Sequence, residues 1–139
     1  MAQMPQGKPL PEITDLTRPF WSAAKAGKLV MQKCGRCGTL DFLPKPWCIE
    51  CGHLGLDWVE VKPQGTVYSH STAYTVMMND PAWKSDLPVV MCIIELDDGP
   101  RMYGQLTDCP PEKVRIGMRV QAHFEPISDA AAVPKFRPI

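Results

Sequence analysis

The chain has 139 residues, and its 15 Lys and Arg balance 15 Asp and Glu, so the formal net charge is zero. This length suits one domain or two small domains, and 45% hydrophobic against 22% charged residues argues against global disorder. A zero net charge removes the broad attraction to nucleic acid of a strongly basic chain. No apolar run approaches the ~20 residues of a membrane span, and residues 1–11 lack the apolar segment of a secretory signal. We therefore expect a cytoplasmic protein, whose six cysteines call for an explanation other than disulfides.

The N-terminal part of the chain predicts an arm followed by a helix. Prolines at positions 5, 9 and 11 and the lack of periodicity favour a flexible arm over residues 1–16, ordered only where something holds it. A helix is expected over residues 17–28, because Thr17 suits the N-cap, Pro19 suits the first turn and Gly27 suits the C′ position. Such a short helix is marginal alone, so it must pack on another element.

The rest of the chain is predicted to be mostly β. Residues 29–58 consist of short extended pieces separated by Cys-Gly turns, which indicates a small metal-binding ribbon. Residues 59–126 hold longer strand candidates, and residues 127–139, with prolines at 134 and 138, are interpreted as an extended C-terminal tail. An N-terminal helix, a ribbon and then about five strands predict a small closed barrel. The longer strand candidates are Gly65–Val76, Val89–Leu96, Arg101–Leu106 and Arg119–Pro126.

Two C-x-x-C-G elements, separated by ten residues, carry the strongest chemical signal. Two residues between thiolates allow a tight turn that points both sulfurs at one ion, and the following glycine can take positive φ so that its N–H approaches sulfur. Two such turns facing one another make a tetrahedral four-sulfur site that suits zinc or a single iron, with no open coordination position. We expect one structural Zn²⁺, held by Cys34, Cys37, Cys48 and Cys51.

Other uses of the cysteines are weaker interpretations. Two disulfides are disfavoured by the paired motif and the missing signal peptide, and a dithiol redox pair by the missing βαβ pattern. His53, two residues after Cys51, is interpreted as a solvated turn residue rather than a ligand. Cys92 lies in an apolar run and is expected to be a small buried hydrophobe. Cys109 precedes two prolines and no spacing pairs it with a base, so we expect no catalytic residue in this chain.

A basic stretch surrounds the cysteine motif. Between residues 25 and 45 five Lys or Arg stand against one acid. Such an excess beside aromatic side chains can receive a phosphorylated ligand, although it can also simply offset the charge of the metal-bound thiolates. The candidate substrate-binding residues are Lys33, Arg36, Lys45 and Trp47.

The segment Pro19–Val30, followed by the two cysteine pairs, resembles small zinc-ribbon/OB-fold proteins that accompany thiolase-type enzymes of acyl-CoA metabolism. The likeness continues in Gly65–Ser71, Ile94–Gly99 and Ile116–Val120, in the right order. It implies a helix leading into a rubredoxin-like zinc ribbon, and then a five-stranded OB-fold barrel. Many members carry Pro-Pro-Arg where this chain has a lysine, Lys45, between two prolines; lysine keeps the charge but lacks the planar fork of arginine.

The resemblance also implies a function. In this family the small protein is a partner of a thiolase-like subunit, sometimes of a hydratase or aldolase, and helps to bind or enclose the CoA thioester. It implies a non-catalytic subunit of a hetero-oligomer, with the reactive residues on the partner. Members accompany thiolases of aromatic acyl-CoA compounds, such as benzoylsuccinyl-CoA in anaerobic aromatic degradation, so an aromatic acyl-CoA is the expected substrate of the complex.

Two other classes of function remain open. An OB barrel that binds single-stranded nucleic acid needs a basic groove, but residues 59–126 hold six Lys or Arg against nine Asp or Glu. A stand-alone enzyme would use Cys109 with a histidine as its base. Salt-dependent oligonucleotide binding would identify the first class, and loss of activity in Cys109→Ala would identify the second.

Overall fold

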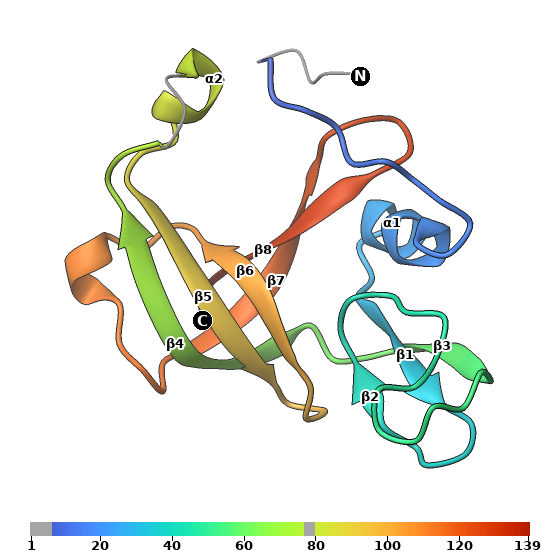
Figure 1. Cartoon of the computed structure of the whole chain (residues 1–139). Coiled ribbons are helices and arrows are strands. Elements are labelled where there is room, and N and C mark those ends of the chain that lie inside the picture. Colours follow the sequence, from blue (N-terminus) through green and yellow to red (C-terminus); the bar gives the residue numbers. More distant parts are fainter. Residues whose placement is uncertain (1–6, 77–79) are drawn as a thin grey trace.

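The computed structural model describes residues 7–76 and 80–139. Figure 1 shows a small sheet beside a larger barrel, with helix α1, Arg18–Lys25, next to both. The helix is shorter than the predicted 17–28, although Gly27 takes the predicted C′ position. Ala26 is the C-cap, Gly27 has φ 78°, and the N–H groups of Gly27 and Lys28 donate to the carbonyl oxygens of Ala24 and Ala23. These are the two hydrogen bonds of a Schellman motif, so the chain leaves the helix directly into the ribbon.

The ribbon consists of β1 (Val30–Cys34), β2 (Leu40–Asp41) and β3 (Leu56–Glu60). These strands form an antiparallel sheet in the order β2-β1-β3. Strands β1 and β3 pair from Val30 opposite Glu60 to Cys34 opposite Leu56. The β1–β2 turn holds the second cysteine of the first pair, and the long β2–β3 loop holds both cysteines of the second pair. The pairing register thus brings both C-x-x-C-G elements to one end of the sheet.

A closed barrel in the order β4-β5-β6-β8-β7 follows the ribbon, and β7 pairs back onto β4. All of its pairings are antiparallel except the parallel contact between β6 and β8. The mostly β class and the five-stranded barrel are therefore confirmed. In chain order, this part of the protein consists of β4 (Gln64–Ala73), helix α2 (Pro81–Lys84), β5 (Val89–Leu96), β6 (Arg101–Leu106), the 3-10 helix η1 (Pro111–Lys113), β7 (Arg119–Pro126) and β8 (Ala132–Pro138).

The predicted C-terminal tail is wrong for residues 132–138, because they form the fifth barrel strand, β8. Alternate side chains of β8, those of Ala132, Pro134 and Phe136, are buried. Strand β8 pairs along its length with β7 but meets β6 at one register position, Leu106 opposite Phe136. A strand paired mainly on one side tolerates proline, since the missing N–H costs no ladder hydrogen bond on the other side. The prolines at positions 134 and 138 are therefore compatible with a barrel strand and do not indicate a tail.

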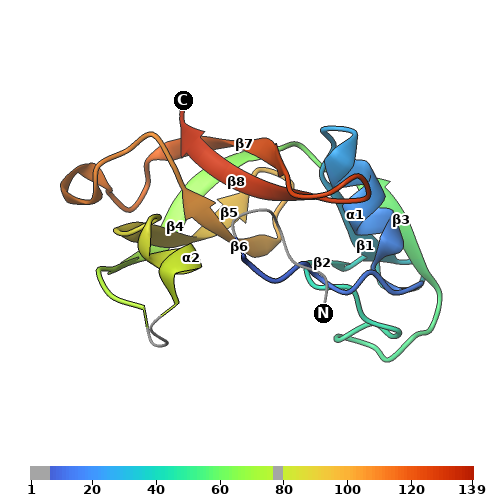
Figure 2. The same ribbon diagram turned by 90° about the horizontal axis from the view of Figure 1, so that it is seen from above.

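One hydrophobic core joins the helix, the ribbon and the barrel. Trp21 and Phe42 pack edge-on against Phe20 of α1, with ring centroids 5.3 and 6.0 Å away. Figure 2 shows α1 beside β8 as well as beside the ribbon, so the marginal helix is supported on both sides. The described helices include none that is long and apolar enough to span a membrane. The buried cluster comprises Phe20, Leu29, Met31, Val61, Val67, Val90, Cys92, Ile94, Leu96, Met102, Leu106, Val114, Val120 and Phe136.

Candidate metal centre

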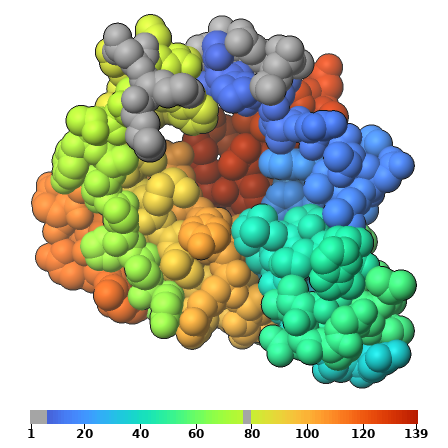
Figure 3. All heavy atoms as spheres, viewed as in Figure 1, coloured from blue at the N-terminus to red at the C-terminus, as the bar shows by residue number. Residues whose placement is uncertain are grey.

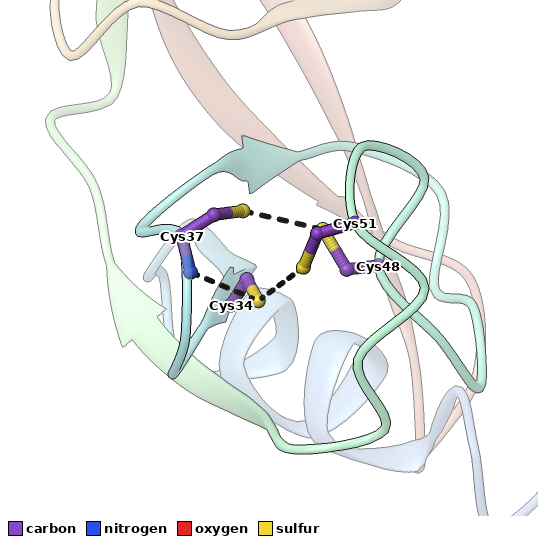
Figure 4. Close-up of side chains that lie close together, drawn as sticks. All are labelled: Cys34, Cys37, Cys48 and Cys51. Atoms are coloured by element: carbon purple, nitrogen blue, oxygen red, sulfur yellow. Dashed lines mark hydrogen bonds between the residues drawn. The ribbon is translucent and has the colours of Figure 1, made fainter.

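The four predicted ligands converge at the end of the ribbon, as Figure 4 shows. All four Sγ atoms lie within 4.8 Å of one another. Cys34 Sγ is 3.6 Å from Cys51 Sγ, and Cys37 Sγ is 3.5 Å from Cys48 Sγ. With Zn–S bonds of about 2.3 Å, a tetrahedral site needs sulfurs about 3.8 Å apart. The four thiols therefore fit a zinc ion with a small adjustment of their positions.

Each pair forms a compact turn that aims backbone N–H groups at sulfur. The N–H groups of Arg36 and Cys37 donate to Cys34 Sγ at 3.4 and 3.5 Å, and that of Glu50 donates to Cys48 Sγ at 3.4 Å. These bonds stabilise thiolates without using a coordination position.

The glycines that follow the pairs differ from expectation in one respect. Gly38 and Gly52 do adopt positive φ, 75° and 74°, as predicted. Their N–H groups, however, donate to the carbonyl oxygens of Cys34 and Cys48, at 3.0 and 2.9 Å, rather than to sulfur. The glycine thus closes the turn onto its own backbone, and the sulfur accepts from residues inside the pair.

The thiols differ in acidity. The Thr39 hydroxyl, helped by its backbone, lowers the pKa of Cys37 to about 6, and the N–H of Cys37 lowers the pKa of Cys34. The N–H of His53 acts to lower the pKa of Cys51, but burial and the neighbouring thiols outweigh it and raise that pKa to about 11. The Cys51 thiol therefore keeps its proton near neutral pH in the absence of metal. Zinc binding must release this proton, because cysteine binds zinc as a thiolate.

The ligand set is complete with four sulfurs. Cys34 and Cys48 are buried, whereas Cys37 and Cys51 reach the surface. Among the described residues, His53 is outside the ligating group; its carbonyl oxygen accepts from the N–H of Cys48 at 2.8 Å, which closes the second turn. Zinc bound by four cysteines has no position left for water or substrate, so it would stabilise the ribbon rather than carry out chemistry.

Lys45, one of the candidate substrate-binding residues, has its ammonium group engaged within the chain. It contacts the Asp41 carboxylate and lies 3.1 Å from the carbonyl oxygens of both Phe42 and Leu43. The buried amide of Gln32 holds the backbone of Lys45, accepting from its N–H at 2.8 Å and donating to its oxygen at 3.0 Å. Lys45 thus shapes the β2–β3 loop. Sequence reasoning missed Gln32, although a lone amide among the apolar residues of a strand was a signal.

The other candidates lie on the ribbon surface. Lys33 on β1 and Arg36 in the first cysteine turn are exposed, and Trp47, next to Cys48, is 54% exposed. The neighbouring Lys25 and Lys28 have partners within the chain, a carbonyl oxygen and a glutamate. Lys33, Arg36 and Trp47 therefore remain as the exposed candidates for binding a ligand.

Comparison with known proteins agrees with this architecture. The rubredoxin-like zinc ribbon domain of ChsH2 matches residues 21–57, and the C-terminal OB-fold domain of ChsH2 matches residues 58–125. A DUF35 domain-containing scaffold protein of Methanocaldococcus jannaschii is 33% identical over 73% of this chain and 70% of its own. A probable enoyl-CoA hydratase alpha subunit of Thermomonospora curvata is 34% identical over 94% of this chain, which spans 40% of that relative's length.

A solved structure, the Ltp2-ChsH2(DUF35) aldolase, aligns with a TM-score of 0.80 and 34% identity over 93% of this chain and 98% of that chain. The domain matches cover the ribbon with its four cysteines and most of the barrel in the order seen here. This chain therefore belongs to the DUF35 family of ChsH2-type proteins, built from a rubredoxin-like zinc ribbon and an OB-fold barrel.

Proposed function

We propose that this chain is a non-catalytic, zinc-stabilised accessory subunit of a cytoplasmic acyl-CoA-processing complex, with a thiolase-type enzyme as its catalytic partner. The observation that carries the proposal is the closed four-sulfur site, whose geometry suits an ion that supports the ribbon and leaves no position for a reacting group. An aromatic acyl-CoA, such as benzoylsuccinyl-CoA, is the substrate class proposed for the complex.

The surroundings of Cys109 favour a partner-based mechanism over a stand-alone enzyme. Its thiol contacts the carbonyl oxygen of Pro110 at 3.6 Å. Nε2 of His123, a candidate base, lies 2.8 Å from the Thr107 hydroxyl. Burial lowers the pKa of His123; Arg137 and Lys135 act in the same direction, against Asp108 and Glu125. A nucleophilic thiol needs a base within hydrogen-bond reach, and this histidine on β7 is instead bonded to Thr107, the residue that follows β6.

The ribbon presents apolar surface suited to a protein partner. Leu43, Trp47, Ile49 and Leu54 all belong to the β2–β3 loop and are each more than half exposed, and several exposed large apolar side chains in one segment indicate a candidate interaction surface. We name these four residues the ribbon patch. Tryptophan and arginine are enriched at interface centres, and the ribbon exposes both Trp47 and Arg36. We propose that the partner covers this patch, and that Lys33 and Arg36 contact the phosphates of the CoA thioester beside it.

A hydratase or an aldolase is the alternative partner. The named relatives favour it, since one is a probable hydratase alpha subunit and another belongs to an aldolase. The accessory role is the same in both cases, but the reaction differs. The reaction that the complex catalyses therefore identifies the class of the partner enzyme.

Co-expression with the product of the neighbouring gene tests the proposal. The isolated complex and each separate protein are assayed for thiolytic cleavage, hydration and retro-aldol cleavage of acyl-CoA substrates. We expect a stable complex that is roughly tenfold or more active than the partner alone. A partner that is fully active without this chain, or turnover by this chain alone, would contradict the proposal.

Two variants test the surface contacts in that complex. Arg36→Ala should raise KM for the CoA thioester, because it removes a phosphate contact, whereas Lys113→Ala, on η1, serves as the matched control and should not. Trp47→Ala should weaken the complex itself, measured by its dissociation constant. An unchanged KM in Arg36→Ala would refute the CoA contact without affecting the accessory role.

A further inference from the structure

A cavity of about 400 Å³ lies on the barrel, away from the four cysteines. Figure 3 shows the hollow between the N-terminal arm, the α2 region and the red strand β8. Its walls come from parts of the chain that are far apart in sequence: Leu10 of the arm, Trp21 of α1, Trp83 of α2, and Val133 of β8. Its size lies within the range of about 300–1,000 Å³ typical of small-molecule sites.

The charged groups around the cavity neutralise one another. Lys8 of the arm pairs with Asp86, and Lys135 of β8 pairs with Glu125 of β7. The side chains of Lys8 and Lys135 are only 15% and 17% exposed, so each pair is held in place at the wall. An ionic occupant would have to break one of these pairs and lose its own hydration. The cavity is therefore suited to an uncharged occupant.

The remaining walls are apolar and partly aromatic. The Trp21 indole is oriented by its edge-on contact with Phe20. The Trp83 ring has the Lys8 ammonium 5.1 Å from its centroid, which holds the arm and α2 together. Gln105 of β6 adds a neutral carboxamide to the lining, and such a group can donate a hydrogen bond to a carbonyl oxygen. Indole faces favour flat rings, and the amide favours a carbonyl next to the ring.

We propose that this cavity binds the uncharged, ring-containing acyl part of an acyl thioester. The proposal rests on the proposed function for its choice of a thioester. A ring between indole and aliphatic side chains displaces water from apolar surface, and the Gln105 amide binds the thioester carbonyl. The nucleotide part of CoA stays outside the cavity, whose lining offers no unpaired positive charge among the described residues.

The test uses the full zinc-loaded chain and the benzoyl thioester of N-acetylcysteamine, which lacks the nucleotide. The chain has four tryptophans, so four indole N–H signals report the binding position in ¹⁵N-labelled protein. We expect saturable shifts for Trp21 and Trp83, and none for Trp47 and Trp58 of the ribbon. The acetyl thioester of N-acetylcysteamine should bind roughly tenfold or more weakly, because it has no ring to bury.

Two variants locate the site. Val133→Phe fills the cavity and should weaken binding by roughly tenfold or more. Trp83→Ala, in α2, should also weaken binding. A loss in both variants is not explained by a local distortion of β8 alone. Ile116→Ala, which truncates an exposed apolar side chain between η1 and β7 outside the cavity lining, is the matched control and should bind like the wild type. Shifts confined to the ribbon tryptophans, no saturable shifts at all, or wild-type binding by both cavity variants would overturn the proposal.

The two proposals fail in different ways. A chain that binds no thioester but still activates its partner would lose the acyl site and keep the accessory function. A chain that binds the benzoyl thioester at Trp21 and Trp83 but has no effect on any partner would keep the binding site and lose the accessory function.

Discussion

Phe136 is the residue that closes the barrel between β6 and β8. Its side chain is fully buried, and its carbonyl oxygen accepts from the N–H of Thr107 at 2.7 Å. A Cβ atom placed on Gly104 of β6 would lie 2.5 Å from Cδ2 of the Phe136 ring. The ring therefore occupies the space that any side chain at position 104 would need.

These contacts predict a double-mutant cycle with a definite sign. Phe136→Ala removes a fully buried ring and should lower the free energy of unfolding by about 3–5 kcal/mol. Gly104→Ala forces the ring to move, an overpacking that should cost about 1–3 kcal/mol. In the double variant the clash is absent and the new methyl group fills part of the vacated space. Its cost should therefore fall short of the sum by about 1–3 kcal/mol.

Urea unfolding of the zinc-loaded proteins, followed by circular dichroism, measures these values. Arg137→Ala, the exposed neighbour on β8, is the control and should stay within about 0.5 kcal/mol of the wild type. A loss below about 1 kcal/mol for Phe136→Ala, or strict additivity in the cycle, would refute the assignment of β8 to the barrel core.

Three further predictions concern zinc binding by the ribbon, the contact between Gln32 and Lys45, and the protonation of His123 on β7. Cys37→Ser should retain well under one equivalent of zinc by metal analysis, while Cys109→Ser retains a full equivalent; full retention in the first would contradict the four-sulfur site. Gln32→Met should lower the free energy of unfolding by about 1–3 kcal/mol, because it unpairs both backbone groups of Lys45; a change below about 0.5 kcal/mol in urea unfolding would argue against that contact. Burial lowers the pKa of His123 below its ordinary value of 6.5, so the unfolded chain binds more protons, and stability should fall as the pH drops through 6.5 and level off below the lowered pKa. His123→Gln should remove this component, so its stability relative to the wild type, measured at fixed zinc, should rise as the pH falls; a constant difference would show that His123 contributes none.

The cysteine turns were predictable from the sequence because their geometry is local. A C-x-x-C-G element forms its turn within a few residues, and Gly38 and Gly52 adopt the predicted positive φ. The helix end at Gly27 depends on equally near neighbours. Even there, the partner of the glycine N–H was predicted wrongly, because sulfur and carbonyl oxygen lie close together and spacing alone does not choose between them.

Lys45 and β8 show what local patterns miss. A lysine near cysteines and aromatics predicts a phosphate contact, but the folded loop places its ammonium group against Asp41 and two carbonyl oxygens. Prolines at 134 and 138 suggest a tail, but the edges of β6 and β7 accept that segment as a strand. Both outcomes depend on groups that approach only when the chain is folded.

The sequence by itself determined the four sulfur ligands, the helix that precedes the ribbon and the mostly β class, since each follows from spacing and periodicity over a few residues. Only the tertiary structure decided how the barrel closes, which basic side chains remain exposed, and that Lys8 and Lys135 border one cavity. The physical reason is distance along the chain: these features arise from contacts between residues far apart in sequence, and no short stretch of sequence contains both partners.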